Sequence, residues 1–220
     1  MALNRYHHQL RALLSPTEAQ LLSKLRTPVL IQDYLDHFPQ NFGPAGDLPR
    51  GKAGPHIKSP RFMLKSKSAH CIEGAIFAAS ALAYHGRTPW LMDIQSRDYD
   101  FDHVVALFKE NGLWGAISKT NHSQLRWRDP VYRTVRELAM SYYHEYFWPD
   151  AGKRMGEKTM RAYSRPFNLT KYPAGLVWAD PKGLDWLAEA LDDSPHSPAV
   201  PRVAEKFLRK ATKIEIISAA

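Results

Sequence analysis

The longest apolar stretch of the chain runs from Cys71 to Tyr84, and it is rich in alanine and free of proline. Residues suited to the two ends of a helix flank it. Ser68 is placed as an N-cap, and Gly86 is placed to adopt the left-handed conformation that ends a helix. A helix that is apolar almost all round is a buried helix. The pattern therefore predicts a central helix around which the rest of the chain is organised.

Strand patterns follow this helix directly. Short apolar runs cover residues 89–94, 102–108 and 113–118, and a polar connection separates the first two. Asn111-Gly112 lies between the second and third runs, and this pair is typical of a tight hairpin turn. The order of helix and three strands predicts a small antiparallel sheet beside the central helix.

Helix starts elsewhere share one signal, a capping residue followed by proline at the first helical position. The pairs with this signal are Ser15-Pro16, Thr27-Pro28, Ser59-Pro60, Asp129-Pro130, Asp180-Pro181 and Ser197-Pro198. The first two predict helices of an N-terminal cover, and the fourth predicts the start of a long helix. Near the C-terminus the pattern predicts a helix over residues 203–211 and a short closing strand over residues 214–217.

The candidate chemistry begins with Cys71, the only cysteine, in the first turn of the central helix. The helix dipole and the unpaired N–H groups at that end favour a thiolate over a thiol. His103 opens the second predicted strand and is the candidate base. Glu73 is expected to act as a first-turn acid that favours the dipole. His70 is expected to point away from Cys71, because adjacent residues on a helix diverge.

This order and spacing resemble the transglutaminase-like superfamily, in a bacterial-type form, over residues 68–118. The resemblance matches Cys71 to the family's nucleophile, His103 to its base and Trp114 to the aromatic residue that opens the third strand. It implies an α+β fold with a papain-like core, in which a small antiparallel sheet packs on a central Cys-bearing helix. Extra helices are expected at both ends. Ser118 stands where the family usually has an aspartate.

Three residues are candidates for the group that orients the imidazole of His103. Ser118 offers a neutral hydroxyl, Asn121 would supply an amide like that of papain-type sites, and Asp93 lies on the preceding strand. An orienting group need not be ionised to fix the tautomer of an imidazole. The sequence leaves these three alternatives open.

We expect a single domain over residues 1–220, with a core at about 60–148, an N-terminal helical cover at 1–40 and a C-terminal extension at 149–220. The resemblance implies cysteine-dependent acyl transfer or amide hydrolysis, of transglutaminase, peptidase or amidase type, on a protein or peptide-like substrate. The alternative is a catalytically inactive binding protein of the same fold, with a basic surface for nucleic acid or an acidic partner.

Charge adds one candidate surface to this picture. The formal net charge is +8, and a stretch without acids holds the basic residues Arg50, Lys52, Lys58, Arg61, Lys65 and Lys67. Only Phe62 adds an aromatic ring to this stretch, whereas binders of single-stranded nucleic acid interleave many aromatic residues with their charges. A solvated loop with no partner is one interpretation, because lysine and arginine are common in exposed loops. Between a nucleic-acid footprint and the border of a catalytic cleft that steers an acidic substrate, we expect the cleft, and we do not favour nucleic acid as a partner.

The remaining composition excludes several classes of protein. One cysteine rules out an internal disulfide framework, and the N-terminus lacks the apolar core of a signal peptide. No apolar run approaches the ~20 residues that span a bilayer. The histidines lack zinc-ligand spacing, and neither a phosphate-binding loop nor a dinucleotide motif is present. We expect a cytoplasmic protein without a metal, a cofactor or a membrane partner.

Overall fold

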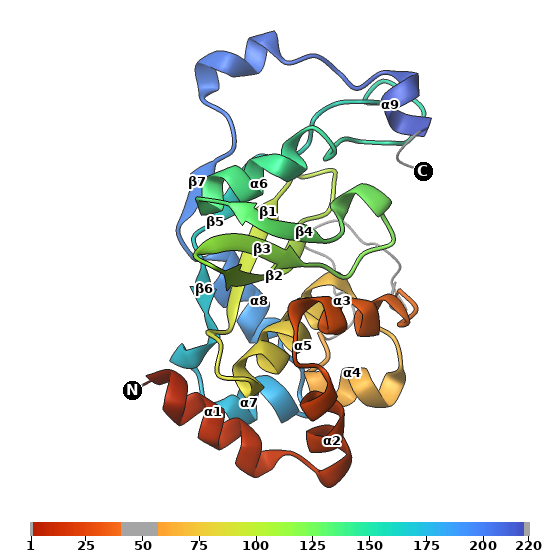
Figure 1. The fold of residues 1–220 in the computed structure, drawn as a ribbon. Coiled ribbons are helices and arrows are strands. Elements are labelled where there is room, and N and C mark those ends of the chain that lie inside the picture. Colours follow the sequence, from red (N-terminus) through yellow and green to blue (C-terminus); the bar gives the residue numbers. More distant parts are fainter. Residues whose placement is uncertain (1, 41–56, 218–220) are drawn as a thin grey trace.

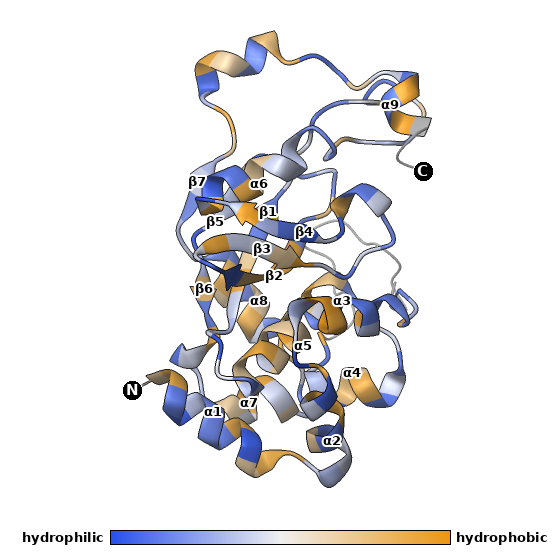
Figure 2. Cartoon of the chain, viewed as in Figure 1, coloured by the Kyte–Doolittle hydropathy of each residue, from blue (hydrophilic) through white to orange (hydrophobic). Residues whose placement is uncertain are grey.

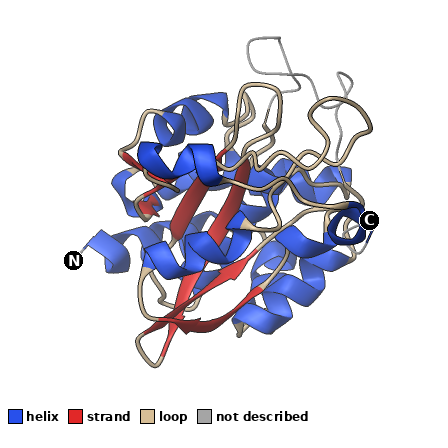
Figure 3. Ribbon diagram, turned by 90° about the horizontal axis from the view of Figure 1, so that it is seen from above, coloured by secondary structure: helices blue, strands red, loops and turns tan. Residues whose placement is uncertain are grey.

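The computed structural model describes residues 2–40 and 57–217, and in it helices surround a central antiparallel sheet (Figure 1, Figure 3). The α helices are α1 (Ala2–Leu13), α2 (Pro16–Lys24), α3 (Pro28–Asp36), α4 (Pro60–Ser66), α5 (Cys71–Tyr84), α6 (Val135–Tyr143), α7 (Ala174–Ala179), α8 (Asp185–Asp192) and α9 (Lys213–Ile217). The strands are β1 (Trp90–Gln95), β2 (His103–Glu110), β3 (Leu113–Ile117), β4 (Arg128–Tyr132), β5 (Ala162–Ser164), β6 (Phe167–Asn168) and β7 (His196–Pro198). Short 3-10 helices are η1 (Ser123–Leu125), η2 (Leu169–Lys171) and η3 (Arg202–Phe207). The predicted α+β class is confirmed.

The sheet has the order β4-β3-β2-β1-β5-β7, and β6 also pairs with β1. All of its pairings are antiparallel. The predicted hairpin between β2 and β3 is confirmed, because Asn111 and Gly112 both have positive φ angles, of 50° and 81°. Two positive φ angles give the turn a twist that matches the twist of the strands. The three strands after α5 therefore form a continuous meander.

Helix α5 is the buried centre of the fold, with every residue from Cys71 to Ala83 buried. The predicted end is confirmed, because Gly86 follows the helix with a φ of 79°. The predicted N-cap is wrong: His70, not Ser68, is the N-cap residue. Gly74 is required by close packing, because a Cβ there would overlap the Cβ of Lys119. The helix therefore approaches the chain just beyond β3 along a surface of small side chains.

Two apolar clusters cover the two faces of the sheet. Successive residues of a strand point to opposite faces. Val104, Ala106 and Phe108 accordingly join the cluster that contains α5, α1, α2, α3 and α7. Val105 and Leu107 join the second cluster, which contains α6. Figure 2 shows hydrophilic and hydrophobic residues alternating along α1, as expected for a helix with one face on this core.

Cap-proline signals identify the starts of α2, α3 and α4 correctly, and α2 has a complete capping box between Ser15 and Glu18. The prediction at Asp129-Pro130 is wrong, because these residues lie in β4 and α6 begins after the cap Thr134. The prediction at Ser197-Pro198 is also wrong, because this pair lies in β7. Strands β4 and β7 are the two edge strands of the sheet. Proline is tolerated in an edge strand because a backbone N–H on the open side is not needed for a hydrogen bond to a neighbouring strand.

Three further predictions in the C-terminal third are wrong. Asp180-Pro181 lies in the turn between α7 and α8, and residues 202–207 form a 3-10 helix in place of the predicted α helix. The expected closing strand at residues 214–217 is the helix α9. The Glu215 side chain accepts hydrogen bonds from both the N–H and the hydroxyl of Thr212, at 2.7 and 2.9 Å. Such a Thr-x-x-Glu pattern stabilises a helix start and outweighs the local alternation of isoleucines.

The C-terminal extension is part of the central sheet. Its strands β5 and β6 both pair with β1, and β7 pairs with β5. Helix α1, which the sequence analysis did not predict, packs against α5 and α7 through Tyr6 and Leu10. Within the described residues, no helix combines the length and the apolar character needed to cross a bilayer.

Gly74→Ala tests the close packing of α5. Alanine in a helix is ordinarily about 1 kcal/mol more favourable than glycine. Here the added methyl overlaps Lys119, so we expect the free energy of unfolding to fall by about 1–3 kcal/mol in a denaturant titration. Gly175→Ala in α7 is the matched control, because a Cβ there meets only a Leu13 methyl at 3.9 Å. Equal stabilisation by both substitutions would contradict the packing argument.

Candidate active site

Cys71 is the first residue of α5 and is buried beside two cavities, of about 100 and 230 Å³. His103 lines the smaller cavity together with Cys71. The N–H groups of the first helical turn have no partner within the helix, so they provide donors beside the sulfur. The structure thus brings the two central residues of the predicted site to one cavity.

The hydroxyl of Ser118 holds the imidazole of His103. His103 Nε2 lies 2.8 Å from Ser118 Oγ, and Ser118 Oγ donates its own proton to the carbonyl oxygen of Leu125 at 2.7 Å. A hydroxyl has a single proton. Its oxygen must therefore accept from Nε2–H, and this leaves Nδ1 as the imidazole nitrogen that serves Cys71. A neutral group fixes the tautomer without supplying a negative charge.

The pKa of the Cys71 thiol is held well below its usual value. Burial would raise this pKa, but the charges of His70 and His103 and their hydrogen bonds to the sulfur outweigh it. A thiolate is the nucleophilic form of cysteine. The site therefore favours a reactive thiolate in a position where burial alone would disfavour it.

Among the described residues, neither of the other two candidate orienting groups is hydrogen-bonded to His103. Asn121 lines the same cavity as Cys71. Asp93 lies opposite Val104 in the register of β1 and β2, whereas His103 lies opposite Ile94. The Asp93 carboxylate instead accepts a hydrogen bond from Nε2 of His196, at 3.1 Å. The structure brings His103 together with Ser118 and places Asp93 with the C-terminal strand β7.

His70 does not point away from Cys71, so that expectation is wrong. Its Nδ1 lies 3.3 Å from the sulfur. The reason is that His70 is the N-cap residue with an extended backbone, at φ −85° and ψ 168°, and does not follow helical geometry. The Glu73 carboxylate supports this turn by accepting from the N–H of His70 and from the N–H of Lys58, both at 2.8 Å. Glu73 therefore acts by specific hydrogen bonds in addition to its charge near the helix dipole.

Gln32 of α3 is a site residue that the sequence analysis missed. Its side-chain amide donates to the carbonyl of Ser118 and accepts from the N–H of Ser118, both at 2.9 Å. It also donates to Asp36 at 2.7 Å. These bonds connect the N-terminal cover to the residue that orients His103. In the sequence Gln32 is only a glutamine near the apolar residues Ile31 and Leu35. In the structure it is buried, and its partner Ser118 lies 86 residues away, which the sequence does not reveal.

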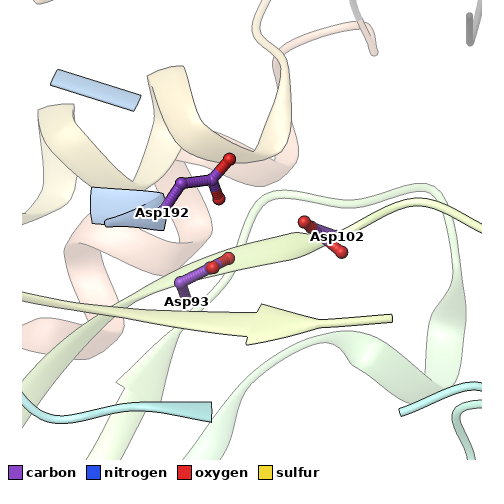
Figure 4. Close-up of side chains that lie close together, drawn as sticks. All are labelled: Asp93, Asp102 and Asp192. Carbon is purple, nitrogen blue, oxygen red and sulfur yellow. The ribbon is translucent and has the colours of Figure 1, made fainter. Parts of the chain in front are cut away.

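Three carboxylates that line the larger cavity lie close together, from β1, from the residue before β2 and from α8 (Figure 4). The oxygens of Asp93, Asp102 and Asp192 lie within 4.8 Å of one another. Burial and the charges of Asp102 and Asp192 raise the pKa of Asp93 to about 6. The spacing would admit a cation, but Asp93 and Asp102 already accept hydrogen bonds from His196 and Ser96. We assign no metal to the cluster.

The basic stretch predicted to steer a substrate has other roles in its described part. Arg61 donates to both carboxylate oxygens of Glu18 at 2.8 Å and so ties α4 to α2. The ammonium group of Lys58 bonds to Ser66 and Ser68 at 2.9 Å. Lys65 and Lys67 are exposed but do not line either cavity at Cys71. Arg50 and Lys52 lie outside the described residues.

Comparison with solved structures finds similarity to Legionella pneumophila LapG. The TM-score is 0.36 and the identity 13%, over 55% of this chain and 74% of that chain. For the EGTA-treated form of the same protein the TM-score is 0.34 and the identity 13%, over 54% and 70%. No family model and no curated protein matches the chain. A likeness at this level identifies no activity, so the chemistry must be argued from the site itself.

Gln32→Ala tests the link from α3 to the site. The substitution leaves the backbone groups of Ser118 without their side-chain partner, so we expect the free energy of unfolding to fall by about 1–3 kcal/mol. Because Ser118 orients His103, we also expect alkylation of Cys71 at pH 6 to slow. Iodoacetamide kinetics and denaturant titration measure the two effects. Gln20→Ala on the exposed side of α2 is the control, and the same loss in both variants would contradict the link.

The Asp93–His196 pair predicts a pH dependence of stability. The pKa values of both groups are raised in the folded protein, so the stability that they contribute is present at low pH and is lost as pH rises through those values. Above its pKa of about 6 the Asp93 carboxyl group is ionised in a buried position, and this lowers the free energy of unfolding. Asp93→Asn removes that ionisable group. Between pH 4 and pH 7 the variant should gain roughly 2–3 kcal/mol relative to the unaltered protein.

Denaturant titrations across this pH range measure the difference. Asp98→Asn is the control, because the Asp98 side chain is 88% exposed. A stability difference between Asp93→Asn and the unaltered protein that is constant with pH would show that Asp93 titrates normally.

Proposed function

We propose that this protein is a cysteine-dependent hydrolase or acyltransferase with a papain-like, transglutaminase-like core, acting on an amide bond of a protein or peptide-like substrate. The single observation that carries the proposal is the hydrogen bond from His103 to the hydroxyl of Ser118. The Ser118 hydroxyl donates its own proton to the carbonyl oxygen of Leu125. This arrangement supports an imidazole whose Nδ1 is available to the buried sulfur of Cys71. A cysteine with no catalytic role would not require an oriented histidine at the same cavity.

In the first half of the reaction, the Cys71 sulfur attacks the carbonyl carbon of the substrate. A C–S bond forms, and the carbonyl oxygen becomes an oxyanion that backbone N–H groups in the first turn of α5 can stabilise. The thiol proton resides on His103 Nδ1. When the C–N bond breaks, this proton passes to the leaving amine, and a thioester remains on Cys71.

In the second half, His103 accepts a proton from water or from a primary amine as that nucleophile attacks the thioester. The C–S bond breaks, and Cys71 leaves as the thiolate that the site favours. Water gives a carboxylic acid and an amine gives a new amide. Hydrolysis and transfer therefore share one acyl-enzyme and differ only in the second nucleophile.

The charges around the cleft bear on the substrate. Asp100 and Asp102 line both cavities at Cys71, and Asp93 and Asp192 line the larger one. Like charges repel across a partly desolvated cleft. We therefore infer that the acyl donor is neutral or cationic near its reacting bond, in place of the acidic substrate expected from the basic stretch.

The proposal is tested with Cys71→Ser, His103→Asn and Ser118→Ala on a labelled peptide library, with and without an added primary amine. We expect product from the unaltered protein only, no turnover in the first two variants, and a loss of about tenfold to a hundredfold in Ser118→Ala, because it removes one buried hydrogen bond. Ser80→Ala, a buried serine at mid-helix, is the control and should retain activity.

A fully folded protein that turns over no peptide and no ester would favour the inactive binding protein. Rapid turnover that survives Cys71→Ser would exclude cysteine chemistry altogether.

A further inference from the structure

Two imidazoles interact with the sulfur of Cys71, and only one of them belongs to the proposed proton-transfer pair. His103 reaches it from β2, and His70 reaches it from the residue before the helix, with Nδ1 at 3.3 Å. The two rings differ in their surroundings. His103 is 4% exposed and bonded to Ser118, whereas His70 is half-buried and lines both cavities.

The position of His70 is held by its backbone. Its N–H donates to Glu73 Oε2 at 2.8 Å, and its carbonyl accepts from the N–H of Gly74 at 2.9 Å. These two bonds fix the N-cap conformation, and in it the ring lies beside the first turn of α5, next to both the Cys71 sulfur and the N–H of Glu73. The contact between His70 and the sulfur is therefore a fixed feature of the helix start.

Most of the other titratable groups that line the two cavities at Cys71 do not favour a thiolate. From the smaller cavity these are Asp100, Asp102, His122, Glu145 and Tyr146. From the larger cavity they are Asp93, Arg97, Asp98 and Asp192. Most are acids, and a nearby carboxylate opposes a second negative charge. Arg97 and His122 are exposed, so the two imidazoles in contact with the sulfur are the groups that can offset the surrounding acids.

We propose that His70 is a second catalytic histidine, which holds the Cys71 thiolate through an Nδ1–H to sulfur hydrogen bond while His103 alone carries the transferred proton. The role of His70 in turnover rests on the proposed function, whereas its contact with the sulfur does not. His70 donates to the thiolate before attack, its bond weakens as the C–S bond forms and the sulfur loses its charge, and it re-forms when the thioester breaks. No proton leaves His70 in the cycle, so the balance of the two half-reactions is unchanged.

This division of roles predicts that the two histidines are separable. Without His103, the thiolate persists because His70 still holds it, but the leaving amine receives no proton. Without His70, proton transfer continues while a smaller fraction of the sulfur is thiolate at low pH. Removing both should return Cys71 to the behaviour of an ordinary thiol, which titrates near ~8.5 or higher when buried.

The experiment measures iodoacetamide alkylation of the full chain from pH 5 to pH 10, for the unaltered protein, His70→Asn, His103→Asn and the double variant. We expect alkylation at pH 6 to fall about tenfold in His70→Asn and in His103→Asn, and about a hundredfold or more in the double variant, as one unit of pKa changes the thiolate fraction tenfold. Turnover of the peptide library should be lost in His103→Asn but reduced only about tenfold at pH 6 in His70→Asn. That reduction should disappear above pH 9.

His85→Asn is the matched control, because His85 caps the other end of the same helix and bonds to the carbonyl of Leu22. Asparagine at position 70 retains a short polar side chain at the N-cap, and circular dichroism shows whether each variant is folded. If His70→Asn does not fold, the alkylation profile of His70→Ser, another N-cap residue, decides the question. An alkylation profile of folded His70→Asn that matches the unaltered protein would overturn the inference.

The two proposals fail in different ways. If alkylation shifts as described but no peptide is turned over, the contact of His70 with the thiolate stands and its catalytic role falls with the proposed function. If turnover depends on Cys71 and His103 but His70→Asn changes neither alkylation nor turnover at any pH, only the inference about His70 is wrong.

Discussion

Helix α5 has no side that faces solvent, and this single constraint orders the elements around it. A helix without a polar face is stable only when other elements cover it in every direction. The sheet covers one side, and α1, α3, α4 and α7 cover the others. The end of the helix that begins at Cys71 is the part left beside open space, in the form of two cavities. Burial of the helix and access to the thiol are therefore consequences of the same arrangement.

The elements predicted correctly are those whose signals are local. Cys71–Tyr84 and the Asn111-Gly112 hairpin are each specified by residues within a few positions of their ends. The proline signals fail at Asp129 and Ser197, because an edge strand accepts proline as readily as a helix start does, and only the sheet order reveals which strands are edges. The same limit hides β5 and β6, which pair with β1 from about 70 residues away.

The predictions about the site follow the same division. The sequence order suffices to nominate Cys71 and His103, because each opens an element. It leaves three orienting groups open, since the hydrogen bond from His103 to Ser118 depends on how β2 and β3 pair. The direction of His70 depends on a backbone angle at the N-cap, and the role of Gln32 depends on a contact with a loop 86 residues away. Such geometry arises only when distant segments have packed.

The place of β1 in the sheet has a consequence for folding. Helix α5, β1, β2 and β3 are consecutive, so the helix that carries Cys71 and the part of the sheet that carries His103 can form from short-range contacts. The opposite edge of β1 acquires its neighbours only from β5 and β6. Contacts between segments distant in sequence form more slowly than local ones. During synthesis on the ribosome, β1 would thus stay an open edge until the last third of the chain has emerged, and this interval is the period in which the nascent protein is most prone to pair with other chains.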